Sequence, residues 1–226
     1  MKILITGVAG FIGYNFAQHL LNSNKKYKIV GIDNLNNYYS VKYKNLRLKN
    51  LKNYKNFKFY KLDISEYKKI KKLFNNHKIN VIFNFAAQAG VRYSLKNPKT
   101  YNSYNINGFF NILEIAREKK INRIFYASSS SIYGDSKNFP LTENLNLNPK
   151  NIYALSKKVN EELAQLYSVL YGIKLTGLRF FTVYGEWGRP DMFIMKYIIS
   201  SIQNKTFYLN NFGNHYRDFT YIKDVN

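Results

Sequence analysis

The 226-residue chain has 46% hydrophobic residues, a formal net charge of +22 at pH 7 and no cysteine. Its length suits one large α/β domain, or one domain with part of a second. The lack of cysteine excludes disulfides and thiolate metal sites, as is typical of a cytoplasmic protein. No apolar run approaches the roughly 18 residues that a membrane helix needs, so we expect neither a membrane span nor a signal peptide.

The positive charge would suit a nucleic-acid-binding protein, but the kind of basic residue argues against that function. Lysine contributes 28 of the 35 basic side chains and arginine only seven. Asn, Tyr, Ile and Phe are abundant as well, and all of these residues have A+T-rich codons. The lysines are also scattered along the chain. We therefore predict solvated helix faces, no nucleic-acid partner, and a positive field that attracts an anionic ligand.

The first strand pattern, at residues 3–5, is followed by regularly spaced glycines and then by a helix pattern. This order is typical of a dinucleotide-binding fold. Gly7 would permit the tight turn, Gly10 would let a pyrophosphate approach the backbone, and Gly13 would let the helix pack closely on the strand. The helix N-terminus would face the phosphates. The spacing is GxxGxxG rather than GxGxxG, so the glycines alone also fit an ordinary turn in an α/β protein.

Asp33 directly follows the second strand pattern, at residues 28–32. An acidic residue about 20 positions after the last glycine, at the carboxyl end of a strand, suits two hydrogen bonds to a ribose diol. The same carboxylate would repel a 2′-phosphate. The sequence therefore predicts NAD rather than NADP as the cofactor.

Strand and helix patterns alternate through the first 180 residues. After a loop and one inserted helix over residues 34–56, they comprise strands at 57–60, 81–85, 123–127 and 175–180, and helices at 65–76, from 97 onward, and at 151–171. The alternation predicts an α/β fold, a doubly wound Rossmann-type parallel sheet, for an NAD-binding domain over residues 1–180. Beyond it the pattern loosens, with a helix near 191–203, and we expect residues 181–226 to be part of a smaller substrate-binding lobe.

Two of these strand ends carry residues suited to the cofactor. Asp63 follows the third strand, where its carboxylate could accept a hydrogen bond from an adenine amino group or could serve the N-terminus of the next helix. The small residues 86–90 follow the fourth strand, where they would let the backbone run beside the cofactor.

Tyr153 and Lys157 lie four residues apart on one predicted helix, so they share a face. An ammonium near a phenol favours the phenolate, which makes the tyrosine a usable general base. Ser129, in the serine run after the fifth strand, would supply a hydroxyl to the substrate oxygen from which the tyrosine takes a proton. The chain has 21 tyrosines, so the pair also fits a chance spacing, and the serine run also fits a turn that caps a helix.

Five segments carry a resemblance to a known family. They are DNLNNYY at 33–39, AAQAGVRYS at 86–94, ASSSSIYG at 127–134, GLRFFTVYGEWGRPDM at 177–192 and RDFTYI at 217–222. Together with the glycine loop, Tyr153 and Lys157, they resemble the extended short-chain dehydrogenase/reductase family and, within it, the UDP-glucuronate 4-epimerases. Asn84 departs from the histidine that relatives often have. The resemblance also implies that the substrate lobe is incomplete, because relatives continue well past Asn226.

The resemblance implies an NAD-dependent 4-epimerisation of a UDP-sugar, in which Tyr153, Ser129 and Lys157 are catalytic. The expected cofactor contacts are Gly7, Gly10, Phe11, Ile12, Gly13, Asp33, Asn34, Asp63, Ile64, Phe85, Ala86, Ala87, Gln88, Asn105, Tyr153, Lys157 and Phe180. The expected substrate contacts are Arg92, Ser130, Ser131, Thr182, Arg189 and Arg217. The short donors Ser130, Ser131 and Thr182 would surround the carboxylate of a uronic acid.

Several alternatives stay open within and outside this family. A neutral-sugar 4-epimerase, a uronate decarboxylase and a 4,6-dehydratase share the same parts, although a dehydratase commonly has Asp-Glu where this chain has Ser130 and Ser131. A catalytically silent NAD-binding chain is a further alternative. The helices at 101–117 and 153–171 are apolar on two sides, which predicts a homodimer.

Overall fold

The computed structural model describes residues 1–23, 25–136, 138–214 and 216–226. The elements are, in chain order, β1 (Lys2–Thr6), α1 (Phe11–Asn22), β2 (Lys28–Asp33), α2 (Val41–Lys52), β3 (Phe57–Lys61), α3 (Tyr67–Asn76), β4 (Val81–Asn84), α4 (Val91–Lys96), α5 (Pro98–Tyr101), η1 (Asn102–Asn107), α6 (Gly108–Glu118), β5 (Arg123–Ser129), η2 (Ser130–Tyr133), α7 (Ile152–Tyr171), β6 (Lys174–Phe180), β7 (Thr182–Tyr184), α8 (Phe193–Ile202), η3 (Asn210–Gly213), β8 (Phe219–Tyr221) and α9 (Ile222–Val225).

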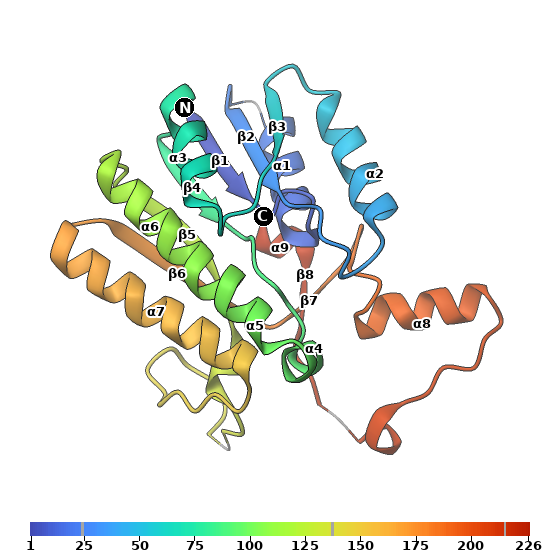
Figure 1. Cartoon of the computed structure of the whole chain (residues 1–226). Helices are drawn as coiled ribbons and strands as arrows, with labels where there is room; N and C mark the ends of the chain where they lie inside the picture. Colours follow the sequence, from blue (N-terminus) through green and yellow to red (C-terminus); the bar gives the residue numbers. More distant parts are fainter. Residues whose placement is uncertain (24, 137, 215) are drawn as a thin grey trace.

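Strands β1 to β6 form one parallel sheet in the order β3-β2-β1-β4-β5-β6 (Figure 1). The prediction of a doubly wound parallel sheet is therefore confirmed. The chain builds outward from β1 through β2 to β3, and then crosses back to place β4 on the other side of β1. In open parallel sheets, ligands bind at the carboxyl ends of the strands where the order reverses in this way. This topology places the candidate site beside β1 and β4.

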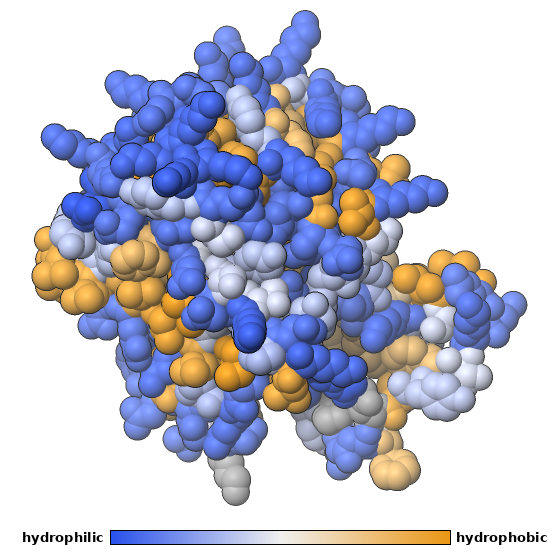
Figure 2. All heavy atoms as spheres, in the orientation of Figure 1, coloured by the Kyte–Doolittle hydropathy of each residue, from blue (hydrophilic) through white to orange (hydrophobic). Residues whose placement is uncertain are grey.

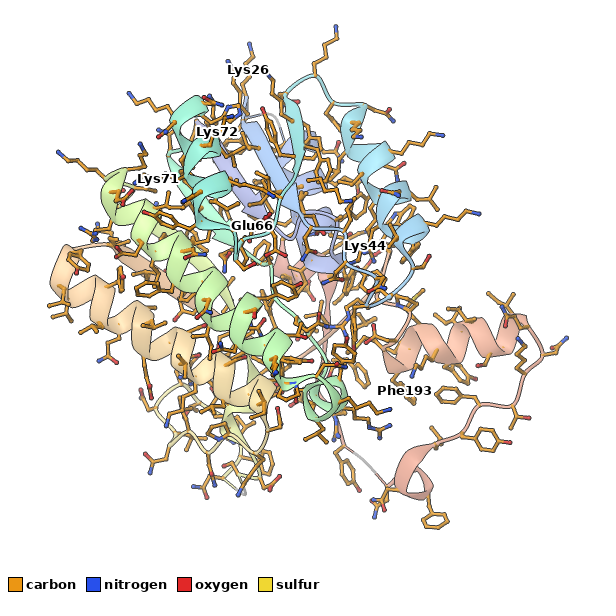
Figure 3. The ribbon with its side chains drawn as sticks, viewed as in Figure 1. Lys26, Lys44, Glu66, Lys71, Lys72 and Phe193 are labelled. Carbon is orange, nitrogen blue, oxygen red and sulfur yellow. The ribbon has the colours of Figure 1, made fainter. Side chains whose placement is uncertain are left out.

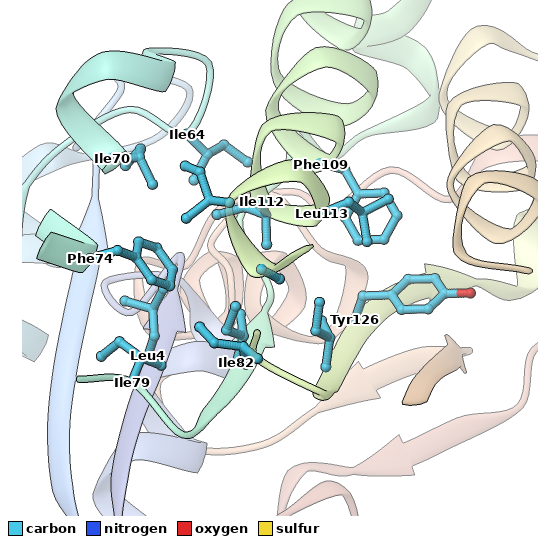
Figure 4. Close-up of a cluster of buried hydrophobic side chains, with 14 of the residues drawn as sticks. Leu4, Ile64, Ile70, Phe74, Ile79, Ile82, Phe109, Ile112, Leu113 and Tyr126 are labelled. Carbon is cyan, nitrogen blue, oxygen red and sulfur yellow. The ribbon is translucent and has the colours of Figure 1, made fainter. Parts of the chain in front are cut away.

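The sheet is covered on both faces by apolar side chains. On one face, Phe109 and Ile112 of α6 and Phe74 of α3 pack with Leu4 and Ile82 of the sheet (Figure 4). On the other face, α1 and α2 pack on the alternate residues of β1 and β2. Burial on both faces explains why these strands read as continuous apolar runs rather than as alternating patterns.

The long helix predicted from residue 97 onward is not one regular α-helix. It consists of α5, the π-helical segment η1 and α6, and η1 interrupts the regular backbone pattern over Asn102–Asn107. Such π segments commonly mark functional sites. The structure also contains α4, which the sequence did not predict because a helix of only six residues shows little periodicity.

The segment after β6 forms a second, two-stranded parallel sheet from β7 and β8. The helix predicted near 191–203 is α8, which has no buried residue and extends away from the main sheet (Figure 1). The last helix, α9, packs against α1. The predicted domain boundary at residue 180 falls between the two sheets; that residues 181–226 form part of a substrate lobe stays a prediction.

Lysines lie mainly on the outer surface. Lys26 and Lys72 are exposed, and they lie at the margin of the molecule in Figure 3, where the space-filling view is largely hydrophilic (Figure 2). Within the described ranges, no helix is both long and apolar enough to cross a membrane. The same residues contain no group of three or more His, Cys, Asp or Glu side chains arranged to hold a metal ion.

Candidate active site

A cavity of about 360 Å³ lies at the carboxyl ends of the parallel strands, lined by residues that follow β1, β2, β4, β5 and β6. This volume is in the range of small-molecule sites. Its lining includes most of the predicted site residues. They are Gly7, Gly10, Phe11, Ile12, Gly13, Asp33, Asn34, Asp63, Ile64, Phe85, Ala86, Ala87, Gln88, Ser129, Ser130, Ser131, Tyr153, Lys157, Phe180, Thr182 and Arg189.

The glycine loop leaves no room for side chains. Gly7 has φ +67°, and a Cβ atom there would lie 2.8 Å from the backbone nitrogen of Ala86. A Cβ at Gly13 would lie only 2.3 Å from the carbonyl oxygen of Gly7. Gly10 opens α1 and donates its N–H to the same carbonyl at 2.9 Å. The bare loop before a helix N-terminus is a cradle of the kind that accepts a pyrophosphate.

Asp33 is the last residue of β2, and its carboxylate is buried beside the glycine loop. Its Oδ2 accepts the N–H of Ala9 at 3.1 Å, and its Oδ1 accepts the N–H of Leu35 at 2.8 Å. Burial raises the pKa of this carboxyl, while the hydrogen bond from Leu35 and the charge of Lys44 act in the opposite direction. The residues present therefore fit a dinucleotide, with a phosphate cradle next to an acidic group that suits a ribose diol.

Asp63 serves the turn before α3 and also lines the cavity. Its Oδ1 accepts from the N–H and the hydroxyl of Ser65, at 2.8 and 2.7 Å, and its Oδ2 accepts from Nδ2 of Asn34 at 2.8 Å. The sequence allowed either a helix-terminal role or a contact with adenine. The structure shows the local role, and the contact with adenine stays a prediction.

Tyr153 and Lys157 lie in the first two turns of α7, whose start is capped by Asn151: its side chain accepts the N–H of Ala154 at 2.9 Å. Lys157 is only 3% exposed, and its Nζ donates to the carbonyl of Ala127 at 2.8 Å. Burial lowers the pKa of Lys157 to about 8. The helix thus holds an ammonium one turn from a phenol, within one cavity.

Ser129 ends β5 and faces the same cavity. Its Oγ accepts the N–H of Ser131 at 3.2 Å and lies 3.2 Å from the hydroxyl of Ser131. The hydroxyls of Ser130 and Thr182 also line the cavity, and neither takes part in a hydrogen bond with another described residue. The strand end therefore offers several short donors, as the serine run predicted.

Asn105 lies behind the cavity wall rather than in it. It is buried in η1, where its Oδ1 accepts the N–H of Gln88 at 2.7 Å and its Nδ2 donates to the Ser156 hydroxyl at 2.9 Å. The hydroxyl of Ser156 in turn donates to the carbonyl of Tyr153 at 2.7 Å. Asn105 thus connects the segment after β4 to the start of α7, and its direct contact with a cofactor stays a prediction.

Two residues that were predicted to bind the substrate lie outside the cavity lining. Arg92 is exposed on α4, and Arg217 is exposed before β8, where its Nη1 donates to the carbonyl of Tyr216 at 2.6 Å. The structure does not bring them to the other site residues. Their roles stay predictions.

Tyr38, Lys44 and Asp191 are among the residues at the cavity that were not predicted as individual site residues. Tyr38 and Lys44 line the cavity. Asp191 accepts hydrogen bonds from the side chains of Tyr38 and Arg189, which both line the cavity. Tyr38 and Asp191 belong to two of the family-like segments, which was the available signal. Their spatial relation was not readable, because they are 153 positions apart in the sequence.

Comparisons with known proteins agree on one family. Residues 3–226 match the model of the NAD dependent epimerase/dehydratase family. The chain is 47% identical to "Protein CapI" of Staphylococcus aureus, covering all of this chain and 67% of that protein. It is 42% identical to a UDP-glucuronate 4-epimerase of Thermodesulfobacterium geofontis, covering 98% of this chain and 68% of that protein.

A crystal structure of a UDP-glucuronic acid 4-epimerase from Bacillus cereus, in complex with UDP-glucuronic acid and NAD, has the same fold. It superposes with a TM-score of 0.93 at 34% identity, over all of this chain and 70% of that one. The chain thus spans about two thirds of the length of these relatives.

We expect the protein to bind NAD at least about tenfold more tightly than NADP, because a 2′-phosphate would lie against the buried carboxylate of Asp33. Asp33→Asn removes that charge and should narrow the preference, as measured by calorimetric titration with both cofactors. Glu162→Gln, the same change on the exposed face of α7, should leave the preference intact. Equal affinities of the wild type for NAD and NADP would contradict the assignment.

The buried Lys157 should make stability depend on pH. Its pKa of about 8 in the folded protein lies below its ordinary value of 10.5, so between these pH values the unfolded chain holds a proton that the folded chain has lost. Relative to Lys157→Met, the wild type should therefore gain up to about 3 kcal/mol of unfolding free energy as pH rises through this window.

Urea denaturation without NAD at a series of pH values would measure this difference. Lys158→Met is the matched control, because Lys158 is the next residue and its side chain is 34% exposed. The unfolding free energy of Lys158→Met should change with pH in the same way as that of the wild type. If the unfolding free energy of Lys157→Met also changes with pH as that of the wild type does, burial does not lower the pKa of Lys157.

Proposed function

Because the chain belongs to the NAD dependent epimerase/dehydratase family, whose cofactor is NAD, we propose that it is a nucleotide-sugar 4-epimerase that interconverts UDP-glucuronate and UDP-galacturonate. The observation that carries this proposal is the cavity that combines the glycine loop with Tyr153, Lys157 and the serine run. The names of the T. geofontis and B. cereus relatives support the uronate as substrate.

The glycine loop and Asp33 would hold the cofactor, the first through backbone N–H groups and the second through the adenosine ribose. A bound NAD would supply a reversible hydride acceptor for C4 of the sugar. Ala86 and Ala87 line the cavity directly after β4, and their small side chains leave the backbone accessible beside the cofactor.

Tyr153 would move the proton in each half of the reaction. As a phenolate it takes the proton of the sugar 4-hydroxyl, and it gives the proton back after the 4-keto sugar has turned over in the site. Lys157 lies one helical turn away on α7 and would supply a positive charge on the same side of the cavity. Ser129 would donate its hydroxyl to the same sugar oxygen, which stabilises the charge that develops there.

The uronate imposes a further requirement on the site. Oxidation at C4 gives a β-keto acid, which loses CO₂ readily when the carboxylate leaves aligned with the carbonyl π-system. An epimerase must therefore hold the carboxylate away from this alignment. Ser130 and Thr182 line the cavity, and their hydroxyls have no partner among the described residues, so these hydroxyls are available to donate to the carboxylate oxygens.

The reaction is tested by identifying the sugar nucleotide formed from UDP-glucuronate and NAD. We expect UDP-galacturonate with little UDP-pentose. Tyr153→Phe should keep NAD affinity within a few-fold and lower turnover by at least about 100-fold, as for the loss of a general base, whereas Tyr197→Phe on the exposed face of α8 should change neither.

Other products would replace the proposal with a specific alternative. Faster turnover of UDP-glucose would indicate a neutral-sugar 4-epimerase, and release mainly of UDP-xylose would indicate a decarboxylase. A 4-keto-6-deoxy sugar would indicate a dehydratase. NAD binding without any turnover would indicate a catalytically silent chain.

We also propose a homodimer formed through α6 and α7. The two helices pack together, yet each leaves large apolar side chains exposed, among them Phe110 on α6 and Leu166 and Val169 on α7, the last of which is 77% exposed. Hydrophobic residues also gather at the left edge of the molecule in Figure 2, where α7 ends in Figure 1. Large exposed apolar side chains gathered on one pair of helices are typical of a protein–protein interface.

Light scattering at micromolar concentration should give the mass of a dimer. Leu166→Glu should shift it toward the monomer, because a charge would be buried at the interface. Leu46→Glu, at an exposed apolar residue of α2 on another part of the surface, is the matched control and should leave the mass unchanged. A monomeric wild type would exclude the dimer.

A further inference from the structure

Arg189 lies in the cavity with its guanidinium already oriented by Asp191. Nε of Arg189 donates to Oδ1 of Asp191 at 3.0 Å, and Nη2 donates to Oδ2. Asp191 thereby occupies the Nε–Nη2 edge of the guanidinium in a bidentate pair. Nη1 donates to no other residue of the described chain, so the Nη1–Nη2 edge is the part of Arg189 left to bind a ligand.

Tyr38 also bonds Asp191. Its hydroxyl donates to Oδ2 of Asp191 at 3.1 Å, and its ring centroid lies 5.7 Å from the guanidinium carbon of Arg189. The Tyr38 ring packs on Tyr93 at 4.9 Å. Its hydroxyl also lies directly against Gly90, where φ is +102° and an added Cβ would lie 2.3 Å from it. The position of Tyr38 is thus determined by two other segments of the chain, residues 90–93 and residues 189–191.

The charges of the three groups are consistent with this arrangement. Burial alone would raise the pKa of Asp191, but the hydrogen bonds and charge of Arg189 and the hydrogen bond of Tyr38 bring it below its ordinary value. Burial and the charge of Asp191 raise the pKa of Tyr38 to about 12. At neutral pH, Asp191 is therefore a carboxylate and Tyr38 a protonated donor.

Contacts that begin at Tyr38 connect Arg189 to the reacting end of the cavity. The Tyr38 hydroxyl lies against Gly90, whose carbonyl accepts from the hydroxyl of Tyr101 at 2.6 Å. The Tyr101 ring in turn lies 6.1 Å from the ring of Tyr153, centroid to centroid. In the proposed reaction Tyr153 meets the hydroxyl on C4 of the sugar. The carboxylate of a uronic acid is attached to C5, the neighbouring ring carbon. An arginine near Tyr153 with one free edge is therefore well placed for that carboxylate.

We propose that Asp191 and Tyr38 are positioning residues that hold Arg189 so that its free edge binds the carboxylate of a UDP-uronate, and that they thereby select this substrate over a neutral UDP-sugar. The proposal rests on the proposed function. A planar guanidinium fixed by two hydrogen bonds loses less freedom on binding an anion than a free side chain does. Asp191 also keeps the guanidinium from being an unpaired charge when no substrate is bound.

Asp191 could instead act only by neutralising Arg189, and the two roles predict opposite results. Removing the charge of Asp191 while Arg189 keeps its orientation would strengthen the attraction of a carboxylate. Loss of orientation would weaken it. The sign of the change in uronate affinity therefore separates positioning from neutralisation.

The test is calorimetric titration of the NAD-loaded protein with UDP-glucuronate and with UDP-glucose. Asp191→Asn should weaken binding of UDP-glucuronate by about tenfold, the size expected for one mispositioned charge-assisted hydrogen bond, and should change UDP-glucose binding less than twofold. Tyr38→Phe keeps every charge and the ring, and should reduce the same preference by a few-fold. Affinity for NAD should not change in either variant.

Tyr93→Phe is the matched control, since Tyr93 touches the Tyr38 ring while its hydroxyl bonds no other described residue; it should keep the wild-type preference. Tighter uronate binding by Asp191→Asn would show neutralisation and overturn the proposal. An unchanged preference in both variants, or equal losses for both sugars, would also overturn it. A wild type without any preference for the uronate would instead show that the proposed function itself is wrong, and the positioning role would fall with it.

Discussion

The rest of the structure depends on the close approach of two backbones at the ends of β1 and β4. Gly7 lies so near Ala86 that a Cβ would meet its nitrogen at 2.8 Å. Thr6 holds the two strand ends together, because its hydroxyl donates to Asn84 at 2.7 Å and accepts the N–H of Ala86 at 3.0 Å. The sheet order reverses at these two strands, so a side chain at Gly7 would force apart the walls of the cavity itself. Asn84 thus has a structural partner within the sheet.

The chemistry of the site depends on burying a charge. Among the described residues, Lys157 has one hydrogen-bond partner, the carbonyl of Ala127. Its ammonium is desolvated by the same packing that brings α7 against β5. A buried ammonium acts strongly on nearby groups because little water screens it. In the proposed reaction, the cost of burying Lys157 and its action on Tyr153 would thus have the same origin.

The loop that carries Arg189 is placed by a second buried cation. Arg47 of α2 is fully buried, and it donates to the carbonyl of Ala9 at 2.8 Å and to the carbonyl of Trp187. Trp187 stacks on Tyr43 with ring centroids 5.4 Å apart. The helix inserted between β2 and β3 therefore fixes both the glycine loop and the turn before Arg189. The sequence predicted this helix only as an insertion before the third strand, without a role in the site.

The sequence by itself determined the features that depend on local order: the glycine loop after a strand, Asp33 at the end of the next strand, and Tyr153 one helical turn from Lys157. Each follows from strand, turn or helix geometry over a few residues. Only the tertiary structure decided that Asp191 orients Arg189 and that Tyr38 holds Asp191. The contact between Tyr38 and Asp191 joins residues 153 positions apart, and no local pattern specifies such a contact because packing of the whole sheet brings the two loops together.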